Sequence, residues 1–180
     1  MAFKHSSRKR SIKRLTLLAM LTALCYVSRS AFQFLPNVQP VTVILIILTL
    51  TLGITDALIV ATLSIFVSNL NLGMGIWTIA QIVSFALIVV ATGLFIKPIF
   101  KKIPFFIMIL YSVITGYAYG FFISAIQAPF FGIQNFWVYY FSGLSFDTLH
   151  AFGNGVFYLI LAPILFPLLT KSIDTYYFHE

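Results

Sequence analysis

Long apolar stretches separated by short polar connections occupy most of this sequence. Stretches of about 20 apolar residues can cross the roughly 30 Å hydrocarbon core of a bilayer as α-helices. Only 8% of the 180 residues are charged and 61% are hydrophobic, whereas about a quarter of the residues in a soluble domain are charged. So much apolar surface requires lipid as the solvent. The sequence therefore predicts one all-α integral membrane domain over residues 1–180.

Six membrane-spanning helices are expected from these stretches. Residues 41–70 are too many for one upright helix, and a turn at Gly53 and Asp56 is expected to divide them into two short helices. Glycine suits the end of a helix, and an acidic residue suits the first turn of the next. The expected spans are about 14–33, two within 41–70, 77–96, from Pro104 to near Gln127, and 144–170.

The basic residues predict how the spans are oriented. Cytoplasmic segments of membrane proteins carry an excess of Lys and Arg. Ten of the eleven basic residues fall on one side if both termini are inside, and only Arg29 does not. We therefore expect a basic cytoplasmic N-terminus (1–13), a bundle (14–170) and a cytoplasmic tail (171–180) in a multi-pass protein of a cell membrane, with no nucleic-acid partner. The ten are Lys4, Arg8, Lys9, Arg10, Lys13, Arg14, Lys97, Lys101, Lys102 and Lys171.

Amides and aromatic residues occupy the connections expected outside, at about 34–40, 70–76 and 127–143. Pro36 and Pro40 restrict the residues before them, so the first connection is expected to be stiff. It either holds Asn37 and Gln39 at the mouth of a cavity, with little entropy to lose on binding, or merely joins two helices. Further candidates for ligand binding are Asn69, Asn71, Trp77, Gln81 and Tyr140. Helix capping is the alternative role for the two asparagines, and membrane-interface anchoring is the alternative for the tryptophan.

Ionisable residues within membrane spans usually face the bundle interior or a water-filled cavity. Asp147, His150 and Asn154 share one helical face by their spacing, and they are candidates for ligand binding. The alternatives are that Asp147 caps the sixth helix after Ser145 and that His150 is a buried, hydrogen-bonded histidine. Arg29 is expected near the outer end of the first helix. There it either extends to the lipid headgroups or faces a polar cavity and pairs with a ligand or with Asp147.

Small residues four apart mark two helices as sites of close packing. Ser112, Gly116, Gly120 and Ser124 are expected to pack against another helix of the same chain. Ala19 and Ala23 in the first helix are candidates for docking on an external partner.

Motifs for intrinsic catalysis are missing from the sequence. It contains no phosphate-binding loop, no HExxH and no GxSxG. No set of His, Cys and carboxylate residues is spaced for a metal site. We therefore expect no enzyme activity, no metal and no intrinsic cofactor, and instead a binding subunit that takes its energy from partner proteins.

Three motifs and the alanine pair resemble the S components of energy-coupling factor transporters, over nearly the whole chain. The pair resembles the AxxxA docking motif of that family. The motifs resemble the subgroup assigned to cobalamin uptake. They are Pro36-Asn37-Val38-Gln39-Pro40-Val41-Thr42; Ser68-Asn69 with Gly73-Met74-Gly75-Ile76-Trp77-Thr78 and Gln81; and Phe146-Asp147 with His150-Ala151 and Gly153-Asn154.

The resemblance implies a prokaryotic vitamin-binding subunit with an S-component-like bundle. Such a subunit binds its vitamin, here cobalamin, from the extracytoplasmic side. It then topples in the membrane while docked on a transmembrane coupling subunit, which two cytoplasmic ATPases drive. A carboxamide-rich ligand would fit the amides and aromatic rings named above.

Alternatives to cobalamin and to transport stay open at this point. Pantothenate is one alternative ligand, because Arg29 can bind a carboxylate, and a queuosine precursor is another. A membrane enzyme that uses Asp147 and His150, or an assembly protein of another membrane complex, is an alternative of a different class.

Overall fold

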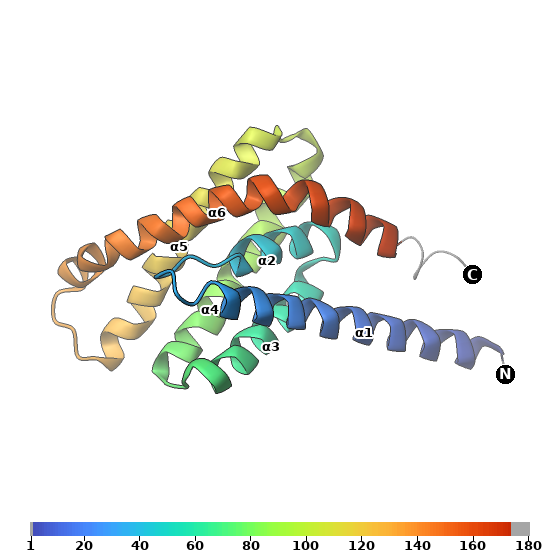
Figure 1. Ribbon diagram of the computed structural model, residues 1–180, viewed down its shortest axis with the longest axis horizontal. Coiled ribbons are helices and arrows are strands. Elements are labelled where there is room, and N and C mark those ends of the chain that lie inside the picture. Colours follow the sequence, from blue (N-terminus) through green and yellow to red (C-terminus); the bar gives the residue numbers. More distant parts are fainter. Residues whose placement is uncertain (1, 174–180) are drawn as a thin grey trace.

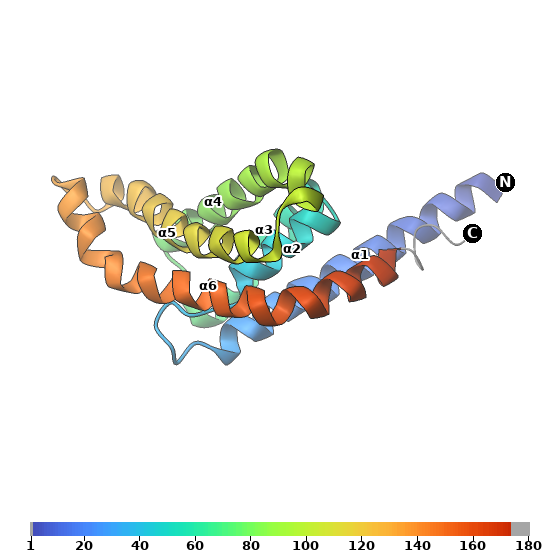
Figure 2. The same ribbon diagram turned by 90° about the horizontal axis from the view of Figure 1, so that it is seen from above.

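The computed structural model describes residues 2–173, and over this range the chain forms six α-helices and no strand (Figure 1). The residues of the expected tail from 174 to 180 lie outside the described range. The helices are α1 (Ala2–Ala31), α2 (Val41–Thr51), α3 (Ile54–Leu72), α4 (Ile76–Ala91), α5 (Phe105–Phe130) and α6 (Phe136–Ile173). A π-helical turn, η1 (Thr92–Ile96), and a 3₁₀ segment, η2 (Lys97–Lys102), continue α4. The beginning of α1 and the end of α6 lie at the same end of the molecule (Figures 1 and 2).

Four helices in the described range are long and apolar enough to cross a membrane. They are α3, α4 with its continuation to Lys102, α5 and α6. The remaining two helices do not meet both conditions, since α1 carries polar and basic residues near both of its ends and α2 has only 11 residues. At 1.5 Å per residue α2 spans about 16 Å, half of the hydrocarbon core. The membrane character is thus supported by four helices, and six complete spans stay a prediction.

The short helix α2 forms the centre of the bundle. It contacts each of the other five α-helices, and the ten residues Val41–Leu50 are all buried. Gly53 has a φ of 104°, which permits the sharp turn between α2 and α3. Lys97 donates a hydrogen bond from Nζ to the Thr49 carbonyl at 3.1 Å, so it satisfies one of the free carbonyls at the end of α2. The predicted turn in 41–70 is confirmed, with Asp56 in the first turn of α3.

Helices α5 and α6 pack closely along the predicted ladder of small residues. A methyl group on Gly116 would lie 2.5 Å from Ala151 Cα, and one on Gly120 would lie 2.0 Å from the Asp147 carboxyl group. Ser112 donates a hydrogen bond to the Asn154 carbonyl at 3.3 Å. Packing within the chain is therefore confirmed as the role of this ladder in α5.

Three predicted boundaries are wrong. Helix α1 begins at Ala2 rather than near residue 14, α5 continues to Phe130, and α6 begins at Phe136 rather than 144. The Asn135 side chain accepts a hydrogen bond from the Val138 backbone at 3.1 Å, which is the pattern of an N-terminal cap. The expected connection 127–143 shrinks to residues 131–135. Asp147 therefore lies in the interior of α6, and the idea that it caps this helix is wrong.

Candidate ligand-binding cleft

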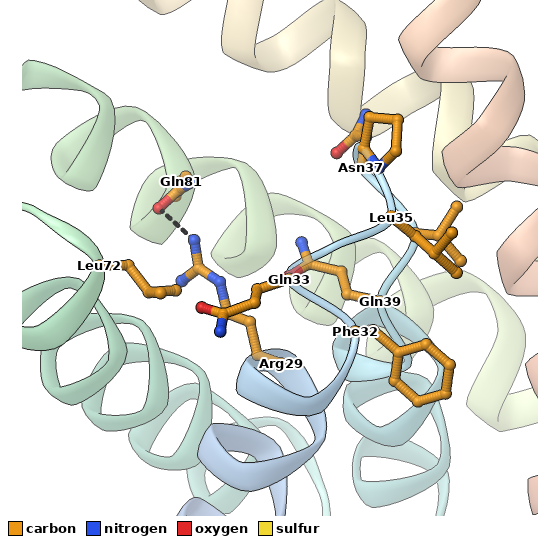
Figure 3. Close-up of a pocket in the computed structure, with 10 residues that line it drawn as sticks. Arg29, Phe32, Gln33, Leu35, Asn37, Gln39, Leu72 and Gln81 are labelled. Atoms are coloured by element: carbon orange, nitrogen blue, oxygen red, sulfur yellow. Dashed lines mark hydrogen bonds between the residues drawn. The ribbon is translucent and has the colours of Figure 1, made fainter.

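Two adjoining cavities lie beside the connection between α1 and α2. The first, about 350 Å³, is lined by Arg29, residues 32–33 and 35–39, Leu72 and Gln81 (Figure 3), and we call it the Arg29 lobe. The second, about 420 Å³, we call the Asp147 lobe. Asn37 and Gln81 line both lobes, so the two form one cleft. The α5 and α6 side of the Asp147 lobe includes Tyr119, Ser124, Gln127, Tyr139, Ser142 and Asp147.

Arg29 points into the bundle from the end of α1, toward Gln81 of α4 (Figure 3). Its guanidinium donates hydrogen bonds to Ser68 Oγ at 2.6 Å and to Gln81 Oε1 at 3.2 Å. Asn69 orients the same glutamine, because its Nδ2 donates to Gln81 Oε1 at 2.8 Å, and also donates to Thr78 Oγ1 at 2.9 Å. All of these partners are neutral. Extension of Arg29 to the headgroups is therefore wrong, and α1, α3 and α4 together position a cation at the cleft.

Asp147 places a carboxylate on the Asp147 lobe. Its side chain is only 6% exposed, and Gly120 supplies the space for the carboxyl group. The one ion pair among the described residues joins Arg14 to Asp56. Asp147 therefore does not pair with Arg29, and no group in the described range donates a hydrogen bond to its carboxylate.

His150 fastens the connection between α1 and α2 to α6. It is fully buried, its Nδ1 lies 2.8 Å from the Asn37 carbonyl, and its Nε2 lies 2.9 Å from Thr42 Oγ1. A carbonyl only accepts hydrogen bonds, so Nδ1 carries the proton and the neutral ring accepts at Nε2 from the threonine. Asn37 Nδ2 also donates to the Phe146 carbonyl at 3.0 Å. The predicted alternative of a buried, hydrogen-bonded histidine is confirmed, and neither ring nitrogen is available to a ligand.

The connection itself has an unusual backbone at the point where His150 holds it. Asn37 has a φ of 58°, a left-handed conformation that asparagine adopts more readily than most residues. Asn37 donates one hydrogen bond to α6, at the Phe146 carbonyl, and accepts another from His150 of the same helix, and both stabilise this conformation. Gln39 lines the Arg29 lobe, as the prediction of a ligand-facing connection requires.

Six of the predicted site residues do not line the cleft: Asn69 and His150, whose contacts are given above, and four others. Trp77 is 43% exposed, and its indole donates a hydrogen bond to the Gly73 carbonyl at 3.2 Å. Asn71 is exposed at the end of α3. Tyr140 stacks on Phe136 at 6.2 Å. Asn154 is fully buried, and neither its amide nitrogen nor its amide oxygen has a hydrogen-bond partner.

The predicted set misses several polar residues of the cleft, among them Gln33, Tyr119, Gln127 and Tyr139. Tyr119 stacks on His150 with 4.9 Å between the ring centroids, and Tyr139 donates a hydrogen bond to Gln127 Oε1 at 3.3 Å. Helical spacing could have pointed to Gln127, because it lies three residues after Ser124 and therefore on the same face of α5 as the small-residue ladder. No comparable signal points to either tyrosine.

The fold and the cleft together define a helical membrane protein with a polar cavity between its helices. Comparison with protein-family models, with curated proteins and with solved structures found no match for this chain. Among residues 2–173, no three His, Cys, Asp or Glu side chains gather in a way that could hold a metal ion.

Proposed function

We propose that this protein is the substrate-binding S component of an energy-coupling factor transporter and that it binds a vitamin, cobalamin, from the extracytoplasmic side. One observation carries the proposal. An otherwise apolar bundle contains a polar cleft lined by the amides of Gln33, Asn37, Gln39, Gln81 and Gln127. Ligand cavities in proteins typically measure about 300–1,000 Å³, and each lobe falls within this range.

The chemistry of the amides supports a corrinoid ligand. A primary amide both donates and accepts hydrogen bonds, and the rim of a corrinoid carries several carboxamides that do the same. The amides of the cleft and the carboxamides of the ligand can therefore form hydrogen bonds with one another, and no charged group is left unpaired. The sequence motifs that resemble the cobalamin subgroup include Asn37, Gln39 and Gln81, which line the cleft.

The exposed side of α1 supports docking on a membrane partner. Ala19 and Ala23 are exposed, whereas Leu18, Leu21 and Cys25 on the other side of the helix are buried. Small exposed residues allow a second helix to approach closely in lipid. We propose that this surface binds the transmembrane coupling subunit and that the two ATPases of the complex supply the energy for transport.

Calorimetry of the purified protein in detergent tests the proposal. We expect heat of binding with cobalamin and none with pantothenate or a queuosine precursor, which are the alternative ligands. Heat of binding with pantothenate or the queuosine precursor instead of cobalamin would support the transport function but would contradict cobalamin as the ligand. Heat with none of the three would contradict the proposal.

The enzyme alternative has less support than the transport subunit. It requires Asp147 and His150 to act together on a substrate, but both nitrogens of the buried histidine already have partners within the protein.

A further inference from the structure

The two lobes of the cleft carry opposite charges that do not neutralise each other. Arg29 lines one lobe and Asp147 lines the other. Within residues 2–173 the only other carboxylate is Asp56, and it pairs with Arg14. The cleft is therefore a polar cavity with a cation in one lobe, an anion in the other and neutral amides between them.

An unpaired carboxylate in a membrane bundle is costly. A buried charge without hydrogen bonds or a counterion is strongly disfavoured, and acidic residues in membrane helices usually have a functional role. Asp147 is more than nine-tenths buried and borders the cavity. Gly120 opposite it provides the room that the carboxyl group occupies, since any larger side chain would overlap it. The structure thus accommodates this carboxylate, but none of the described residues donates a hydrogen bond to it.

The two charged groups require opposite chemistry from a ligand. A carboxylate accepts hydrogen bonds, so Asp147 requires a donor such as an amide N–H or an ammonium group. A guanidinium only donates, so Arg29 requires an acceptor oxygen, which binds most strongly when it is anionic. Two of the guanidinium nitrogens of Arg29 already donate hydrogen bonds to neutral side chains. Arg29 also lines the cavity.

We propose that the cleft recognises one ligand at two points of opposite polarity: Asp147 accepts a hydrogen bond from an N–H group of the ligand, and Arg29 donates to an anionic oxygen. The inference rests on the proposed function and names the groups of the vitamin that each lobe binds. In cobalamin the N–H group belongs to a peripheral carboxamide, and the anionic oxygen belongs to the phosphodiester of the nucleotide loop. The shared amides of Asn37 and Gln81 then contact the part of the ligand between these two groups.

Calorimetry with two variants and modified ligands tests this inference on the full chain. In Asp147→Asn the carboxylate becomes an amide, and in Arg29→Gln the guanidinium becomes an amide. We expect each to raise the dissociation constant for cobalamin about tenfold or more, because hydrogen bonds to charged groups are the stronger ones. Asp56→Asn and Arg14→Gln are the matched controls, since they remove the same charges outside the cleft, and we expect unchanged affinity for both.

Modified ligands separate recognition from a general loss of structure. Cobinamide lacks the phosphodiester, so Arg29→Gln should bind it as well as the unmodified protein does. In cobalamin monocarboxylates one carboxamide is replaced by a carboxylate, which would lie against Asp147 as a like charge. We expect at least one monocarboxylate to bind the unmodified protein weakly and to regain affinity with Asp147→Asn. A merely structural role of Asp147 would produce no such rescue.

The outcomes distinguish this inference from the proposed function. If the unmodified protein binds cobalamin and both variants bind it equally well, the two-point recognition is wrong and the vitamin-binding function stands. If the unmodified protein binds none of the three vitamins, the proposed function is wrong and the inference fails with it. If Asp147→Asn does not yield folded protein, Gly120→Ala replaces it, because the added methyl group displaces the carboxyl group but keeps its charge. A tenfold loss in that variant supports the inference, and unchanged affinity overturns it.

Discussion

His150 joins three segments that lie far apart in the sequence. Its ring connects the middle of α6 to the Asn37 carbonyl and to Thr42 at the beginning of α2, and it stacks on Tyr119 of α5. The same contacts fix the connection that separates the two lobes of the cleft. The conformation of this connection, including the left-handed backbone of Asn37, therefore depends on a residue that does not itself line the cleft.

Removal of the imidazole should destabilise the connection and weaken ligand binding. His150→Ala leaves the buried Thr42 hydroxyl without this partner, at about 1–3 kcal/mol, and it also leaves the partly buried Asn37 carbonyl without its hydrogen bond. Thr42→Val removes only the partner of Nε2 and keeps the bond to Asn37. We expect His150→Ala to lower the midpoint of thermal unfolding more than Thr42→Val does, and to expose residues 32–40 to protease. Equal effects of the two variants would contradict this role.

The shared face of the ionisable residues in α6 could be predicted, whereas their roles could not. Helical spacing places Asp147, His150 and Asn154 together, and all three are buried. The role of His150 depends on contacts with Asn37 and Thr42, more than 100 positions away, and that of Asp147 depends on Gly120 of another helix. Such contacts arise when the connection closes on α6, and no local pattern of residues encodes them.

The close approach of α5 and α6 forms the wall of the Asp147 lobe. Gly116 lies against the backbone of Ala151, and Gly120 lies against the Asp147 carboxyl group. The helices therefore cannot accept even one methyl group at Gly116 without moving apart. Gly120 lies one turn after Gly116 in α5, so separation of the two helices at Gly116 would also displace the Asp147 carboxylate that packs against Gly120.

Gly116→Ala should destabilise the bundle, although alanine is the better helix former. The added methyl group would meet the Ala151 backbone at 2.5 Å, and overpacking of this kind costs about 1–3 kcal/mol. Gly143→Ala in α6 is the control, because nothing lies within 4 Å of a methyl group at that position. We expect a lower thermal midpoint in detergent only for the first variant, and equal midpoints would show that α5 and α6 can separate freely.

Helix existence was easier to predict than helix ends. The apolar stretches indicate every helix, and Gly53 marks the turn inside 41–70. The sequence places the beginning of α6 eight residues too late, because Ser145 is a suitable cap and the aromatic residues before it are typical of an interfacial connection. The Asn135 cap was present in the sequence, but aromatic residues within the first turns obscured it.

The arrangement of the whole molecule agrees with a single orientation in the membrane. The beginning of α1 and the end of α6 lie at one end (Figures 1 and 2). The cleft is lined by the end of α1, the connection that follows it and the N-terminal half of α6. The positive-inside rule predicts that the lysines of η2 face the cytoplasm and that the cleft faces outside.

Cysteine labelling tests this orientation. Cys25 is the only cysteine, so Cys25→Ala provides a cysteine-free background that should stay unlabelled. In that background we expect Gln134→Cys to react with a membrane-impermeant maleimide in intact cells. Lys102→Cys should react only after permeabilisation, since both residues are exposed and they flank opposite ends of α5, a helix long and apolar enough to cross a membrane. Labelling of Lys102→Cys in intact cells would reverse the orientation.

The burial of nearly all of α2 has a consequence for permeability. The connection that lines the cleft leads into α2, which is about 16 Å of close-packed helix from Val41 to Thr51. We expect such packing to interrupt any continuous water path along α2, so the protein should leave the electrical insulation of the membrane intact. If the protein delivers a bound molecule as proposed, we expect the whole bundle to move relative to the lipid, because the buried helix α2 leaves little room for a path within it.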